Sequence, residues 1–142
     1  MQAYRGVIMG DNKGARKANE RFFDAYSEFD GLIRERYNIE EDGVHYYLVK
    51  MKEAVLEARE AIPEWDTVYK RLKAIRDRYR NLKEGGMFDD FTGKDEDLVW
   101  MQVFTEKLEA DADPLSKYSR LGTLHYKNGM TFWQKVITFF GG

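Results

Sequence analysis

Cysteine is absent from the sequence, and histidine and proline occur only twice each. Without cysteine the chain has no disulfides, no thiolate nucleophile and no cysteine-based zinc or iron–sulfur site. Such a composition is typical of proteins from a reducing compartment. The sequence also has no apolar run long enough to span a membrane, and its first residues lack the apolar core of a signal peptide. These absences predict a cytoplasmic protein with no membrane partner.

Large apolar side chains, in contrast, are plentiful. The 142 residues include nine Tyr, nine Phe and three Trp, and the hydrophobic fraction is 43%. Each such side chain stabilises a fold by about 1.5 to 3 kcal/mol when it is buried. A chain of this length is typical of one domain and can bury a core without disulfides. The sequence therefore predicts a single domain over residues 1–142.

Apolar residues recur at steps of three and four along most of the chain, which is the spacing of amphipathic helices. The predicted fold class is therefore all-α, a compact bundle of five or six helices. Residues 1–10 are a candidate for a short extended N-terminal arm. The predicted helices cover about residues 13–37, 40–62, 63–83, 95–110, 114–120 and 131–140, and the last of these is amphipathic and aromatic.

The net charge of −2 conceals two segments of opposite charge. Residues 64–83 contain seven basic and three acidic residues, a balance of +4, whereas residues 84–113 contain two basic and ten acidic residues, a balance of −8. Two interpretations are open. Either the segments lie side by side in the fold, or one of them forms a patch that binds a charged partner.

The predicted helix at 63–83 carries basic residues on both sides of its apolar arc. Arg71 and Arg78 lie on one side, and five residues that we call the basic flank lie on the other: Lys70, Lys73, Arg76, Arg80 and Lys83. Such a helix is a candidate for binding phosphate groups, although long basic side chains often simply border their own core. One alternative function is therefore nucleic-acid binding by the basic flank, or mimicry of nucleic acid by the acidic residues 84–113.

Arg120 and His125 are separated by four residues. This segment resembles the Arg-x4–6-His motif of HEPN ribonucleases, which are helical, usually dimeric proteins that cleave RNA. The resemblance implies that His125 acts as a general acid or base and that Arg120 neutralises a phosphate. Leu121 stands where that family usually has a polar residue, and Gly122 is expected to end the helix that begins at residue 114. A ribonuclease is the second alternative function.

The other patterns support neither a metal site nor a cofactor. Neither His45 nor His125 has the spacing of a zinc or di-iron motif, and the sequence contains no phosphate-binding glycine loop and no nucleophile elbow. The acidic residues between 89 and 97 are explained by the positive end of the helix that they begin. We expect His45 to be a partly buried structural residue.

Two apolar segments favour a protein partner. Apolar residues cover more than half of the circumference of the predicted helix at 95–110, which places it either at the centre of the domain or in a subunit interface. Residues 131–140 form a second segment rich in large apolar side chains. The candidate partner-binding residues are Trp100, Phe104, Phe132, Trp133, Val136, Ile137 and Phe140.

The main functional hypothesis from the sequence is a non-enzymatic helical interaction or accessory protein. We expect its partner to be another protein or a second copy of the chain. In the second case, which we favour, the protein forms a homo-oligomer. Its size and charge would suit an accessory protein of a phage or mobile element that binds a host or phage protein.

Overall fold

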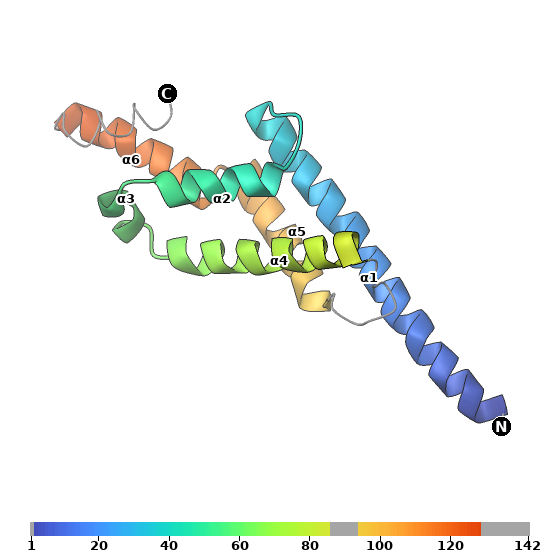
Figure 1. Cartoon of the computed structure of the whole chain (residues 1–142). Helices are drawn as coiled ribbons and strands as arrows, with labels where there is room; N and C mark the ends of the chain where they lie inside the picture. The colour runs from blue at the N-terminus through green and yellow to red at the C-terminus, as the bar shows by residue number, and fades with distance from the viewer. Residues whose placement is uncertain (1, 86–93, 129–142) are drawn as a thin grey trace.

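The computed structural model describes the backbone of residues 2–85 and 94–128, and the side chains of residues 14, 16–57, 59–85 and 94–121. The all-α prediction is confirmed, and the predicted helix at 131–140 lies outside the described residues. The described backbone forms six helices (Figure 1): α1 (Gln2–Tyr37), α2 (Gly43–Glu53), α3 (Leu56–Glu60), α4 (Trp65–Gly85), α5 (Asp95–Glu109) and α6 (Pro114–Asn128).

The long helix α1 is the element that most of the others pack against. It contacts α2, α4 and α5, while α6 contacts α2 and α3. In Figure 1, α2 and α4 lie side by side, and the N-terminal part of α1 extends beyond the other helices. Because α1 begins at Gln2, the prediction of an extended arm at residues 1–10 is wrong. Gly6 and Gly10 each cost this helix about 1 kcal/mol, but no proline interrupts its backbone hydrogen bonds.

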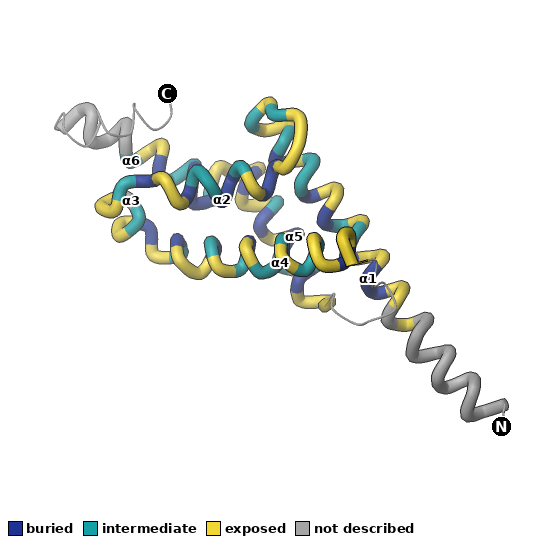
Figure 2. Tube along the Cα trace, viewed as in Figure 1, coloured by how far each residue is buried: buried dark blue, intermediate teal, exposed yellow. Residues whose placement is uncertain are grey.

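Aromatic side chains from five helices meet in the core. The Phe104 ring of α5 forms T-shaped pairs with two other rings. Its partners are Tyr47 of α2, at 5.5 Å between ring centroids, and Phe29 of α1, at 5.8 Å. Trp65 of α4 packs against Tyr118 of α6, also at 5.8 Å. All five side chains are buried, and Figure 2 shows buried residues along the inner faces of the helices. Such edge-to-face pairs add about 0.5 to 1.5 kcal/mol each to the stabilisation from burial.

The predicted helix over residues 40–62 is in fact two helices, because the backbone is extended at Ala54 and Val55. The guanidinium of Arg59, one turn beyond this break, donates hydrogen bonds to the backbone carbonyls of Lys52 and Ala54. These bonds satisfy carbonyl groups that the end of α2 leaves without helical partners. No proline or glycine marks the break in the sequence, which is why helical spacing alone predicts one helix.

Helix α6 begins where the sequence predicts and ends later. Asp113 directly precedes it and accepts hydrogen bonds from the backbone N–H and hydroxyl of Ser116 and from the hydroxyl of Tyr47. The helix then continues through Gly122 to Asn128, so the prediction that Gly122 ends it is wrong. A single glycine costs a helix only about 1 kcal/mol, which the surrounding helical residues offset.

A buried carboxylate joins α4 to α5. Asp97, in the first turn of α5, is fully buried and accepts two hydrogen bonds from Arg78, at 2.8 and 2.9 Å, and one from Arg71, at 3.1 Å. The Arg71 guanidinium also lies 6.0 Å from the centre of the Trp100 ring. A buried charge is stable only with such partners. This cluster therefore fixes how α4 is rotated relative to α5.

Helix α5 lies at the side of the domain. Its residues Met101, Phe104 and Leu108 are buried, but Val99 and Val103 are 62% and 43% exposed. Of the two placements that the sequence allows for this helix, the central one is therefore wrong. Single exposed valines are common on protein surfaces, so their exposure does not by itself identify an interface.

Asp97→Asn is expected to destabilise the fold by about 2 to 3 kcal/mol, because Arg71 and Arg78 lose their buried counter-charge but keep some contact with water. Asp95→Asn is the matched control, since Asp95 is exposed and lies 3.9 Å from Arg21; it should cost less than about 0.5 kcal/mol. Urea-induced unfolding at neutral pH measures both effects. Equal unfolding free energies for the two variants would contradict the role of Asp97.

The ion pair between Glu64 and Lys117 is expected to make stability depend on pH. Burial by itself raises the pKa of Glu64, but the Lys117 ammonium outweighs it and holds that pKa below its usual value. A carboxylate with a lowered folded pKa stabilises the fold above its unfolded pKa of about 4.3 and loses this contribution as the pH falls through the folded value. Glu64→Gln should therefore cost about 0.5 kcal/mol at pH 7, and its effect should shrink below pH 4 in thermal unfolding experiments. A cost that is the same at both pH values would argue against the pair.

Candidate functional site

One carboxylate holds the turn between α1 and α2. Asp30 of α1 accepts hydrogen bonds from the backbone N–H of Val44, at 2.8 Å, and from Nε of Arg34, at 3.1 Å. Gly43 lies so close to α1 that a Cβ atom there would stand 2.5 Å from the backbone oxygen of Asp30. Only glycine allows this approach, because the neighbouring backbone cannot move aside. The acidic end of the turn, residues 41–42, is thereby fixed beside α1.

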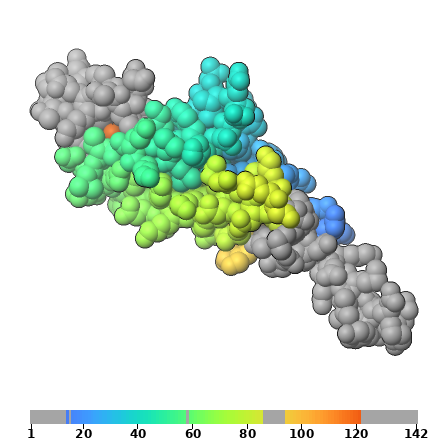
Figure 3. All heavy atoms as spheres, in the orientation of Figure 1, coloured from blue at the N-terminus to red at the C-terminus, as the bar shows by residue number. Residues whose placement is uncertain are grey.

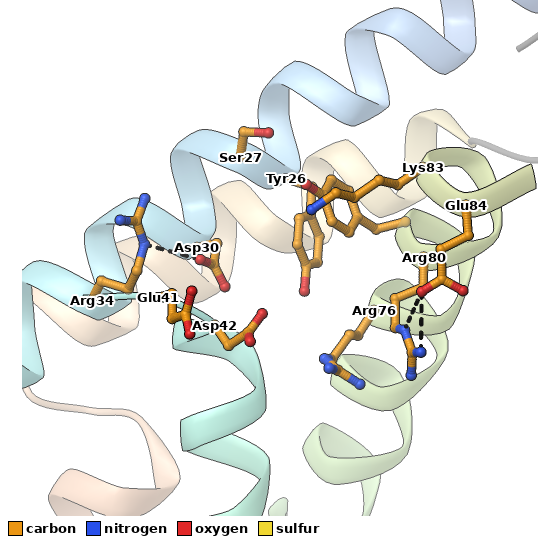
Figure 4. A pocket seen from close by; sticks show the side chains of 11 residues that line it. Tyr26, Ser27, Asp30, Arg34, Glu41, Asp42, Arg76, Arg80, Lys83 and Glu84 are labelled. Atoms are coloured by element: carbon orange, nitrogen blue, oxygen red, sulfur yellow. Dashed lines mark hydrogen bonds and ion pairs between the residues drawn. The ribbon is translucent and has the colours of Figure 1, made fainter. Parts of the chain in front are cut away.

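A cleft of about 520 Å³ opens between this turn, α1 and the C-terminal half of α4. We call it the α1–α4 cleft. Figure 3 shows the face of the molecule on which the turn and the end of α4 lie. Figure 4 shows the cleft from close by, with acidic side chains from α1 and the turn on one side and basic side chains from α4 on the other. Its volume is in the range of known ligand sites.

Three residues of the basic flank line the α1–α4 cleft, namely Arg76, Arg80 and Lys83. The other two, Lys70 and Lys73, are exposed on the same helix but lie outside the cleft lining. The structure thus brings together part of the predicted phosphate-binding set and separates the rest. Sequence spacing places all five on one side of α4, but only the C-terminal half of that helix lines the cleft beside the α1–α2 turn.

Some of the charges in the cleft neutralise each other. Arg34 pairs with Asp30 and Arg80 pairs with Glu84, in both cases at 3.1 Å and one helical turn apart. Each pair lies within a single helix, so neither one bridges the cleft.

Four other charged side chains of the lining have no ion-pair partner among the residues that the structure describes. Arg76 and Lys83 extend from α4, and Glu41 and Asp42 belong to the turn on the opposite side (Figure 4). From the sequence, Glu41 and Asp42 indicate only the acidic start of a helix. Their role in the cleft depends on a contact between α1 and α2 that no local pattern predicts.

Stacked aromatic rings lie between the two charged sides. Tyr26 stacks on Tyr79 at 4.0 Å between centroids, and Phe23 stacks on Tyr79 at 4.8 Å. The Tyr79 ring is thus already occupied by two stacking partners from α1. Burial raises the pKa of the Tyr26 hydroxyl, and the nearby charge of Asp30 raises it further. The hydroxyl therefore stays protonated at neutral pH.

The side chains that line the cleft can bind charged groups, but none of them is an activated nucleophile. The hydroxyl of Ser27 donates a hydrogen bond to the backbone carbonyl of Phe23, at 2.9 Å, and so is tied to its own helix. Within the described residues no histidine lines the cleft, and no cluster of three or more acidic or histidine side chains is arranged to hold a metal ion. His45, expected to be partly buried, is exposed.

The predicted partner-binding residues are only partly described. Phe104 is 2% exposed and belongs to the core, so within the single chain it offers no surface to a partner. Trp100 is half-buried and stacks on Phe104, at 5.1 Å between centroids. The remaining five lie outside the described residues: Phe132, Trp133, Val136, Ile137 and Phe140.

Arg120 and His125 both belong to the continuous helix α6. Positions five apart on an α-helix differ by about 140° around its axis, so the two do not share one face. The Arg120 guanidinium is exposed and donates a hydrogen bond to the backbone carbonyl of Asp111, at 2.5 Å. The side chain of His125 lies outside the described residues.

The acidic residues 84–113 do not form one continuous exposed surface. Asp97 and Asp113 are fully buried and hold neighbouring helices, and Glu84 is paired with Arg80. The contact between Asp97 and two arginines of α4 agrees with the interpretation that the basic and acidic segments lie side by side.

Comparison with known proteins identifies one relationship. A family of unknown function (DUF6548) matches residues 20–131, which include the α1–α4 cleft and most of the described chain. The chain belongs to this family. No curated protein and no solved structure matches it. Among the described residues, every helix is too short or too polar to cross a membrane.

Tyr26→Phe is expected to change the free energy of unfolding by less than about 0.5 kcal/mol, because the hydroxyl makes no hydrogen bond within the described part of the chain. Tyr26→Ala should cost about 3 to 5 kcal/mol, since it removes a buried ring that stacks on Tyr79. Urea-induced unfolding of both variants provides the measurement. A cost above about 1 kcal/mol for Tyr26→Phe would mean that the hydroxyl has a structural partner.

Proposed function

We propose that this protein is a non-enzymatic binding protein and that a polypeptide partner docks in the α1–α4 cleft. The observation that carries the proposal is the set of four charged side chains that face each other across the cleft without ion-pair partners in the described structure: Arg76, Lys83, Glu41 and Asp42. Charges at such a surface favour binding when a partner supplies the opposite charges.

A polypeptide fits this surface better than the other candidate partners. The charged groups of a nucleic acid are all negative phosphates, which Arg76 and Lys83 attract but Glu41 and Asp42 on the opposite side repel. Stacking of a base on Tyr79 would have to compete with Tyr26 and Phe23, which already stack on that ring. A polypeptide segment can supply side chains of both signs. Binding by the basic flank to nucleic acid is therefore less well supported than docking of a protein.

Catalysis is the less favoured alternative. The single serine of the cleft lining is bonded to its own helix, and Arg120 lies on α6, outside this lining. The ribonuclease hypothesis requires that Arg120 and His125 converge, and their positions on one helix point in different directions.

Arg76→Glu is expected to abolish the capture of the partner. It replaces one of the two unpaired cations on the basic side of the cleft with a carboxylate, which would repel the acidic groups of the partner. The matched control is Lys70→Glu, which makes the same charge change on the same helix outside the cleft. The immobilised wild-type chain and both variants are exposed to lysate, cross-linked and compared by mass spectrometry. A protein retained by the wild type and by Lys70→Glu, and lost with Arg76→Glu, is the expected result.

The same protein set on all three baits would overturn the proposal, provided that thermal unfolding shows both variants to be folded. If the protein retained in an Arg76-dependent manner is the chain itself, the partner is a second copy. Light scattering of the purified chain would then detect the oligomer directly.

A further inference from the structure

The charges of the α1–α4 cleft are divided by sign between its two sides. After the pairs Arg34–Asp30 and Arg80–Glu84 are set aside, the basic groups that are left lie on α4 and the acidic groups lie on the α1–α2 turn. Figure 4 shows the separation, with Asp42 on one side and Arg76 on the other. The cleft therefore has a positive wall and a negative wall, and the eight charged side chains of its lining sum to zero.

The positions of the two walls are fixed by separate contacts. The hydrogen bonds of Asp97 to Arg71 and Arg78 set the rotation of α4 and so direct Arg76 away from α5. The close packing of Gly43 on α1 sets the turn. Because each wall is held by its own contacts, the opposite charges stand apart across the cleft with no ion pair between them in the described structure.

Such an arrangement selects against partners of a single charge sign. A strongly acidic segment is attracted by Arg76 and Lys83 but repelled by Glu41 and Asp42. A strongly basic segment is attracted by the two acidic residues and repelled by the two basic ones. The Tyr26 hydroxyl between the walls is a neutral group that can donate to a carboxylate or accept from an ammonium.

We propose that the α1–α4 cleft recognises a mixed-charge polypeptide segment. An acidic side chain of the segment binds Arg76 and Lys83, and a basic side chain binds Glu41 and Asp42. This inference rests on the proposed function and adds the charge pattern of the partner. It predicts that tight binding requires both acidic and basic side chains in the same segment. A surface that binds only phosphates or only cations would instead prefer a segment of a single charge sign.

Three fluorescein-labelled synthetic peptides of equal length test the pattern. One alternates Glu and Lys with Ala, one contains Glu and Ala, and one contains Lys and Ala. Fluorescence anisotropy measures binding to the whole chain at low and high salt, about 50 and 500 mM, because screening weakens charge-based binding. The mixed peptide should bind the wild type at least about fivefold more tightly than either uniform peptide, and salt should weaken this binding.

Two charge reversals should switch the preference. Among the four unpaired positions, Arg76→Glu leaves three acidic groups and only Lys83 as a basic one, and the preferred probe should become the Lys peptide. Among the same four positions, Glu41→Lys leaves three basic groups and only Asp42 as an acidic one, and the preferred probe should become the Glu peptide. Each switch should amount to about fivefold in affinity. Lys70→Glu should leave the order of the three peptides unchanged.

A wild-type preference for either uniform peptide would overturn the inference, and so would equal effects of Arg76→Glu and Lys70→Glu. If a uniform peptide binds and is lost with Arg76→Glu, the cleft still binds a polypeptide, and only the charge pattern is wrong. A different result is that the wild type prefers the mixed peptide and the charge-reversal variants switch to the uniform peptides as expected, while the capture experiment finds no Arg76-dependent protein. In that case the charge preference of the cleft stands, and the proposal that a protein partner docks there fails. The two failures are therefore distinct.

Discussion

The buried carboxylate of Asp97 is the interaction on which the arrangement of this protein depends. It neutralises Arg71 and Arg78, which lie on one side of the apolar arc of α4, and it does so from the first turn of α5. A buried charge without these partners would be costly, so α4 has one favourable rotation against α5. The remaining basic residues of α4 must then face the opposite way. The same contact that stabilises the core thereby decides which cations reach the α1–α4 cleft.

A second carboxylate plays the equivalent part on the other side of the cleft. Asp30 holds both Arg34 and the backbone N–H of Val44 in the first turn of α2, and Gly43 allows the two helices to approach closely. The acidic residues of the turn are therefore fixed, and they do not collapse onto the basic wall. Opposite charges that are held apart in this way are available to a partner. This is the physical reason for favouring a binding protein over an enzyme, in a chain whose family has no assigned function.

Much of the fold could be predicted from local patterns, because helical spacing and helix-start residues are local signals. The all-α class, the start of α6 directly after Asp113 and the extent of α4 follow from them. The errors concern where helices end, which depends on side-chain contacts and on the neighbouring helical residues as well as on the single residue at the end. Arg59 caps a helix end that no proline or glycine marks, and Gly122 does not end α6. The cleft was missed for a related reason, since Glu41 and Asp42 look like ordinary residues at a helix start.

The sequence by itself determined that the chain forms amphipathic helices, that α4 carries basic residues on both sides of its apolar arc, and that cysteine chemistry is excluded. These properties depend on composition and on spacing within one helix. Only the tertiary structure decided which of the basic residues are neutralised and which face the acidic turn. That choice depends on the rotation of one helix against another. This rotation is set by the buried carboxylate of Asp97, whose two arginine partners lie 19 and 26 positions away in the sequence.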